Sequence, residues 1–170
     1  AFFAEKVRKQ QYGLDESRVR EYFEFERVLH DGLFFTMQAF FGITMKPRPD
    51  LPVYHPDVKV FEVFDKGGSS IAIFYGDYFA REGKRGGAWM DDCRGRRITS
   101  TGLQKPVAYL TCNFNGPVNG KPALFTHDEV VTLFHEFGHG IHHMLTKVDV
   151  GGVSGINGVP WDAVELPSQF

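Results

Sequence analysis

The sequence predicts an α+β fold that is mainly helical, with a small sheet beside one long helix. Apolar residues recur at helical spacing through residues 1–41, whereas β-branched and aromatic runs lie at 58–75 and 107–112. A second helical stretch with a strong start signal follows at 127–145. With 170 residues, 42% of them hydrophobic, the chain is long enough for one domain with its own core.

Helices are expected first along the chain. Residues 1–11 are typical of a helix that ends near Gly13, and residues 16–41 predict a helical region that stops at Gly42. Between Pro47 and Pro56 the prolines are too frequent for a regular element. The first quarter of the chain is therefore predicted to be helical and to be followed by an irregular segment.

Strands are expected in the middle of the chain. The runs 58–64 and 71–75 flank a glycine- and serine-rich turn, which predicts a hairpin. Residues 83–104 are rich in glycine and charge and predict a long loop, and residues 107–112 predict a further strand. A sheet of three or more strands follows. The strand at 107–114 could be an edge that pairs with an extended peptide or an interior strand.

The long helix has a clear beginning. Thr126 and Glu129 form a Thr-x-x-Glu capping box, which predicts a helix from His127 to about Leu145. Four glycines between residues 151 and 158 then favour positive backbone φ angles or mobility. Whether this loop closes over a ligand or only connects two elements stays open. A second short helix is expected near Pro160.

Composition excludes several classes of function. A net charge of −2 without a basic stripe argues against a nucleic-acid partner, and the basic residues at 84–85 and 94–97 are expected to lie on a solvated loop. No apolar run approaches the roughly 18 residues of a membrane span. The two cysteines have no paired-ligand spacing, so we expect buried free thiols in a cytoplasmic protein.

The residues that indicate chemistry lie on the long helix, at His135-Glu136-Phe137-Gly138-His139. On a helix, four residues advance about 400° and about 6 Å, so both imidazoles leave the same face within reach of one ion. Zinc suits this geometry, and Glu136, about 100° further round, could accept a proton from zinc-bound water. The alternative is a pair of core histidines with separate hydrogen-bond partners.

A catalytic zinc normally takes three protein ligands. A third histidine at the usual distance is excluded, because that position is Leu145. The acids after His139 are Asp149, Asp162 and Glu165, of which we expect Glu165 to be the ligand. Asp162, three residues earlier, could orient a ligand histidine or only favour the helix dipole. His142 and His143 are expected to be partly exposed near the helix end.

The motif, its glycine-rich loop and residues 161–169 resemble the thimet-oligopeptidase family of zinc peptidases, most of all its bacterial oligopeptidase A branch. The resemblance covers essentially the whole chain and implies a zincin-type catalytic core with a small sheet beside the His-Glu-x-x-His helix. It also implies that His135, His139 and Glu165 bind zinc and that Glu136 is the general base. One departure, at 22–24, is the absence of a proline that relatives often have, and it bears on a helix start. Further stretches support the resemblance at 53–58, 74–81, 84–90, 106–114 and 120–124.

The function that this resemblance implies is endopeptidase hydrolysis of short unfolded peptides by a cytoplasmic, monomeric parent protein. The alternatives are a dipeptidyl carboxypeptidase of the same family or, for the isolated chain, a non-enzymatic zinc-binding piece. Residues 1–170 are expected to be a partial catalytic domain of a larger, mostly helical peptidase, without its N-terminal helical half and its C-terminal remainder. The family's substrate-holding histidine and tyrosines are expected beyond residue 170.

Overall fold

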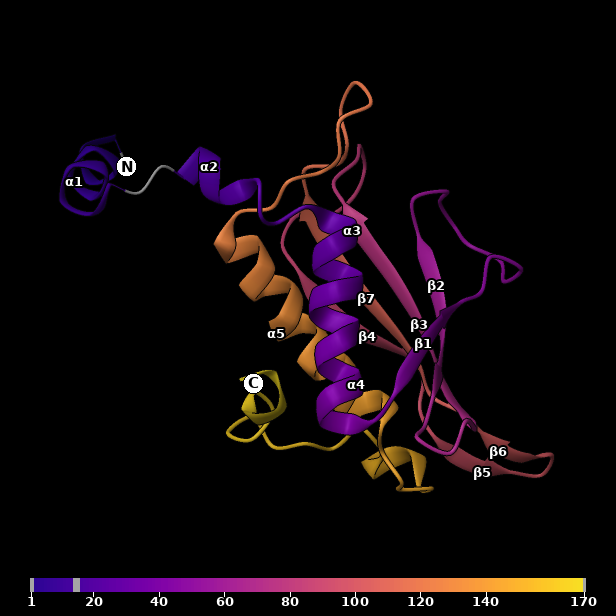
Figure 1. The fold of residues 1–170 in the computed structure, drawn as a ribbon. Helices are drawn as coiled ribbons and strands as arrows, with labels where there is room; N and C mark the ends of the chain where they lie inside the picture. Colours follow the sequence, from indigo (N-terminus) through magenta and orange to yellow (C-terminus); the bar gives the residue numbers. More distant parts are fainter. Residues whose placement is uncertain (1, 14–15, 170) are drawn as a thin grey trace.

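The computed structural model describes residues 2–13 and 16–169, and it shows an α+β fold. A mixed five-stranded sheet has the long helix α5 and the α3–α4 helix packed on one face, while α1 and α2 project away from the sheet (Figure 1). Ala1 and Phe170, the two ends of the predicted partial domain, lie outside the described residues. The elements are α1 (Phe2–Tyr12), α2 (Glu16–Arg20), α3 (Phe25–Arg27), a π-helical turn η1 (Val28–Phe34), α4 (Phe35–Phe41), β1 (Thr44–Pro47), β2 (Lys59–Phe64), β3 (Ser70–Phe79), β4 (Trp89–Arg94), β5 (Arg97–Thr99), β6 (Gly102–Gln104), β7 (Val107–Phe114), α5 (His127–Met144) and the 3-10 turns η2 (Gly151–Val153) and η3 (Leu166–Ser168).

The sheet has the strand order β1-β2-β3-β7-β4. Strands β3 and β7 run parallel and all other neighbours run antiparallel, while β5 and β6 form a separate hairpin. The predicted hairpin is confirmed as β2–β3, with Phe61 opposite Phe74. The prediction of three or more strands is also confirmed.

The prediction of a long loop at 83–104 is wrong, because this region contains β4, β5 and β6. Asp91 and Asp92 in β4 have low intrinsic strand propensity, which hid the strand in the sequence. Pairing with β7 compensates for that propensity, since Trp89 lies opposite Thr111 and Met90 opposite Leu110. Tertiary pairing therefore decides the conformation of this segment.

The predicted helical region 16–41 is divided at residues 21–24. The second part begins at Glu24, whose carboxylate accepts hydrogen bonds from the backbone N–H groups of Glu26 (3.2 Å) and Arg27 (2.9 Å). This side-chain cap is the start signal of the second part of the helical region. The helix then ends at Gly42, as predicted, with a left-handed φ of 68°.

Aromatic side chains fill the space between the helices and the sheet. Phe74 of β3 meets Phe137 of α5 edge to face, with ring centroids 5.0 Å apart, and both side chains are fully buried. Phe34 packs on Phe61 in the same manner at 4.9 Å. Burying one such side chain contributes about 1.5–3 kcal/mol, so the first contact stabilises the packing of α5 on the sheet and the second that of η1.

The cysteines only partly follow the prediction of buried thiols. Cys112 is buried in β7, and burial raises the pKa of its thiol, whereas Cys93 in β4 is exposed. No helix among the described residues is long and apolar enough to cross a bilayer.

Candidate metal centre

Helix α5 carries the predicted histidine motif, and its start is built as expected. The Thr126 hydroxyl accepts from the backbone N–H of Glu129 (3.1 Å), and the Glu129 carboxylate accepts from the backbone N–H of Thr126 (2.7 Å). The helix runs from His127 to Met144, and it buries Leu133 and Phe137 toward the sheet. The capped start and the buried face together set the direction in which the opposite side of the helix points.

His135 and His139 project from that helix one turn apart. Their ring centroids are 5.0 Å apart, and the planes are nearly perpendicular at 86°. The side chain of His135 is 34% exposed and that of His139 is 14% exposed. The motif therefore places two imidazoles at the surface of the fold, within reach of solvent, rather than in its core.

Glu165 reaches both histidines from the C-terminal segment. Its Oε2 atom lies 3.2 Å from Nε2 of His135 and 3.2 Å from Nε2 of His139. The same oxygen accepts a hydrogen bond from the Ser168 hydroxyl at 2.8 Å. This bond, followed by the nearby histidines, lowers the pKa of Glu165 and favours its ionised form.

Ser168 is a further site residue, which the sequence pattern alone did not indicate. Its side chain is only 4% exposed, and its hydroxyl also contacts the Glu165 carbonyl oxygen at 2.8 Å. The turn around it is not the short α-helix expected near Pro160. Residues 161–165 are turns, and the 3-10 turn η3 packs against α5. Pro167 in η3 and the spacing of three residues between Glu165 and Ser168 were the available signals.

The three side chains fit a metal ion. One ligand atom from each of His135, His139 and Glu165 lies within 4.8 Å of the others. In a tetrahedral zinc site with bonds of 2.0–2.1 Å, ligand atoms are about 3.3 Å apart. The two 3.2 Å histidine–carboxylate distances match that spacing. Two nitrogen ligands and one carboxylate oxygen are also a donor set that zinc accepts and that leaves a fourth position open.

Glu136 is not one of these three converging ligands, and it directly follows His135 on α5. Burial raises the pKa of its carboxyl, and the Glu165 charge adds to the rise, while His135 and His139 oppose it. A carboxyl with a raised pKa beside a metal position is suited to accept a proton.

The other predicted polar residues differ in outcome. The Asp162 side chain is exposed, and within the described residues (2–13 and 16–169) it makes no hydrogen bond or ion pair. Its role in orienting a ligand histidine therefore stays a prediction. His142 is partly exposed, as expected, and burial lowers its pKa. The prediction for His143 is wrong: it is fully buried, and its Nε2 atom lies 2.8 Å from the Arg94 carbonyl oxygen. The chain crosses back over the end of α5 and covers this ring.

The edge strands of the five-stranded sheet are β1 and β4, so β7 is not an edge strand. Strand β7 is interior, between β3 and β4, so an edge role for residues 107–114 is excluded. On the side of β4 away from β7, no strand within the described part of the chain pairs with it. Helix α5 packs against β4, which places an unpaired strand edge beside the helix that carries the histidines.

A buried ion cluster fixes the loop that leads into β4. The Asp77 side chain is 3% exposed and accepts from Arg81 at 2.7 and 2.8 Å and from Lys84 at 2.9 Å. Burial raises the pKa of Asp77, but the hydrogen bonds from Arg81, Lys84 and Tyr54 outweigh it and lower the pKa to about 2. The expectation of a solvated basic loop is therefore wrong for Lys84, which is 5% exposed.

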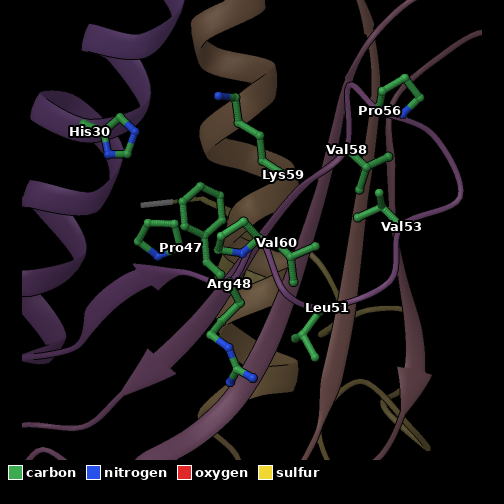
Figure 2. Close-up of a pocket in the computed structure, with 11 residues that line it drawn as sticks. His30, Pro47, Arg48, Leu51, Val53, Pro56, Val58, Lys59 and Val60 are labelled. Atoms are coloured by element: carbon green, nitrogen blue, oxygen red, sulfur yellow. The ribbon is translucent and has the colours of Figure 1, made fainter.

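An apolar cavity on the described part of the chain is separate from this site. It has a volume of about 450 Å³ and lies between β2 and the proline-rich segment before it (Figure 2). Its cations already have partners, because Arg48 donates to Asp50 and Glu62 and Lys59 contacts Glu26. None of its lining residues belongs to the histidine–glutamate cluster.

Known proteins match the whole chain. The sequence model of peptidase family M3 matches residues 1–170. Oligopeptidase A of Escherichia coli (strain K12) is 59% identical over 171 residues, which are 100% of this chain and 25% of that protein. Oligopeptidase A of Haemophilus influenzae is 55% identical over 170 residues, 99% of this chain and 25% of that protein. The dipeptidyl carboxypeptidase of E. coli is 48% identical over 172 residues, 100% of this chain and 24% of that protein. The chain thus spans about a quarter of the length of these relatives.

Proposed function

The chain belongs to peptidase family M3, the thimet-oligopeptidase family, and on this basis we propose that it supplies the zinc site of an endopeptidase that hydrolyses short peptides. The observation that carries the proposal is the convergence of Glu165 Oε2 on both histidine Nε2 atoms at 3.2 Å. We propose His135, His139 and Glu165 as the ligands and residues 1–170 as part of a larger catalytic domain. A cytoplasmic, monomeric parent acting on unfolded peptides is part of the same proposal.

Bound zinc would supply Lewis acidity, which polarises the scissile carbonyl and lowers the pKa of a water. Glu136 accepts the proton of the attacking water and later transfers it to the leaving amine. Its partly buried position and raised pKa support both steps, because the carboxyl must hold the proton between them. Ser168 keeps the Glu165 carboxylate oriented toward the histidines through the 2.8 Å hydrogen bond.

The free edge of β4 is the surface on which an extended peptide would lie. Backbone N–H and C=O groups of an edge strand pair with a substrate main chain and leave its side chains free, which suits a peptidase of broad specificity. The contact of β4 with α5 brings such a peptide beside the histidines. This assignment replaces β7 as the substrate-pairing strand.

The decisive experiment compares wild type, Glu136→Gln and Glu82→Gln in the full-length parent. Zinc content is measured by elemental analysis and turnover with an internally quenched peptide. We expect Glu136→Gln to keep zinc and to lose about 10²–10⁴-fold in kcat, the range for a general base. Glu82 is exposed, so Glu82→Gln is the matched control with full activity. Full turnover by zinc-loaded Glu136→Gln would refute the role of Glu136, and zinc-free wild type with full turnover would refute the metal site.

Dipeptidyl carboxypeptidase activity is the alternative, since one relative of that name is 48% identical to the chain. A peptide with an amidated C-terminus separates the two activities. An endopeptidase cleaves its interior at an unchanged rate, whereas an enzyme that removes C-terminal dipeptides loses turnover because the terminal carboxylate is absent.

A further inference from the structure

Residues 149–158, which we name the strap, lie between helix α5 and Glu165 in the sequence. They are hydrogen-bonded to residues 92–98, which include the end of β4 and the beginning of β5. At the beginning of the strap, the Asp149 carboxylate accepts a hydrogen bond from Arg96 Nε at 2.7 Å. The Asp149 carbonyl oxygen also accepts from the backbone N–H of Ile98 at 3.1 Å. The glycine-rich strap is therefore not a free connector.

A second contact binds the other end of the strap to the edge strand. The Asn157 side-chain amide donates to Asp92 Oδ2 at 3.1 Å and to the Ser154 carbonyl oxygen at 3.2 Å. Asn157 also lies close to Gly95, where an added Cβ would be 3.5 Å from the Asn157 amide nitrogen. One side chain thus fixes both the shape of the strap and its position on β4.

A third contact is buried where the strap crosses the end of α5. His143 is fully buried, and its Nε2 lies 2.8 Å from the Arg94 carbonyl oxygen at the end of β4. Gly155 has a φ of +65° and passes so close that an added Cβ would lie 2.5 Å from His143 Nδ1. Because a carbonyl only accepts, Nε2 of His143 carries the proton. Helix, edge strand and strap therefore meet at this ring.

These contacts matter for the proposed metal site because of where the strap leads. Only seven residues separate Asn157 from Glu165, and they form short turns closed by bonds such as Ala163 N–H to Pro160 C=O at 3.0 Å. The Glu165 side chain itself is 59% exposed, and the hydrogen bond that orients its Oε2 locally comes from Ser168. The position of its backbone therefore depends on two things, the packing of η3 against α5 and the way in which the preceding segment is held.

We propose that Asp92 and Asn157 are positioning residues for the third metal ligand. Their hydrogen bond fixes the strap on the edge strand, and the strap in turn fixes where Glu165 stands relative to the histidines of α5. The same bond connects the strand edge that would pair with a peptide to the carboxylate that would hold the metal. The inference rests on the proposed zinc site and adds residues that lie outside it.

The test is a double-mutant cycle in the full-length parent: wild type, Asp92→Ala, Asn157→Ala and the double variant. The zinc dissociation constant is measured by chelator competition without peptide, and the thermal unfolding temperature is measured on the metal-free proteins. Partners that orient a ligand directly are worth about 10–100-fold in metal affinity, and Asn157 acts one step further away, so we expect about 5–20-fold weaker binding for each single variant. The double variant should bind no more weakly than Asn157→Ala, because one shared bond is lost.

A matched control variant and the unfolding temperature of the metal-free protein distinguish the possible outcomes. Asn115 is exposed and has no side-chain partner among residues 2–13 and 16–169, so Asn115→Ala is the matched control with unchanged zinc affinity. Weaker zinc binding at an unchanged unfolding temperature of the metal-free protein supports positioning rather than loss of fold. Unchanged affinity in Asn157→Ala, or independent effects of the two substitutions, overturns the inference while leaving the zinc site intact. Failure of wild type to bind zinc overturns the proposed function first.

Discussion

Replacing Asp77 by asparagine tests whether the buried ion cluster holds the loop that leads into β4. The substitution preserves the shape of the side chain and removes its charge, so it imitates the protonated acid. Lys84 would then lose its charged partner while its side chain stays only 5% exposed. Its ammonium would keep the carbonyl oxygens of Asp77 at 3.0 Å and Phe79 at 2.8 Å as acceptors. A loss of stability without a gross change of fold is expected.

The magnitude follows from the pKa of Asp77. The folded-state pKa of about 2 lies below the ordinary value of 3.8, so the ionised group stabilises the fold above pH 3.8 and this contribution disappears as pH falls through 2. Linkage converts the difference to about 2.4 kcal/mol at pH 7 and to about 1.3 kcal/mol at pH 3. The gap between wild type and Asp77→Asn should therefore narrow by about 1 kcal/mol between these two pH values.

The assay is urea denaturation of the full-length parent at pH 7 and pH 3, with unfolding monitored by circular dichroism. Asp31 is exposed and has no side-chain partner in the described ranges, so Asp31→Asn is the matched control with an unchanged free energy of unfolding. A gap that is below about 1 kcal/mol at pH 7, or that does not shrink at pH 3, would show that Asp77 is not held ionised by Arg81 and Lys84.

Two further predictions concern the proposed third metal ligand, Glu165, and the N-terminal cap of helix α5. Glu165→Ala should lower zinc content and affinity in the full-length parent, because it removes the carboxylate that lies 3.2 Å from both histidines; unchanged stoichiometry and affinity would move the ligand to Asp162 or another acid. Thr126→Ala removes the cap of α5 and should lower the free energy of unfolding by about 1 kcal/mol in urea denaturation, whereas Thr126→Ser, which keeps the hydroxyl, should cost far less.

The sequence was informative where the signal is local. The capping box at Thr126 and Glu129 and the spacing of His135 and His139 depend on residues within one or two helical turns of each other. The β2–β3 hairpin is also local, because a short turn joins two runs of strand-forming residues. These predictions are confirmed, since the neighbours that decide the conformation are neighbours in the chain.

The sequence failed where distant segments decide. Strand β4 forms by pairing with β7, about 18 residues further along the chain. Its acidic residues have low strand propensity, so the neighbouring residues alone do not predict a strand there. His143 is buried because the strap returns over the helix end, and Lys84 is buried because Asp77 lies beneath it. Neither burial is encoded in the residues next to those side chains.

By itself, the sequence determined which side chains could bind a metal, because helix geometry aligns His135 with His139 and few acids follow them. Only the tertiary structure decided that Glu165 meets both imidazoles, that Ser168 orients it and that β4 is the edge strand packed against α5. The physical reason is the length of chain between these parts. A separation of 26 residues between His139 and Glu165 carries no angular information, so packing and hydrogen bonds such as those of the strap must set their geometry.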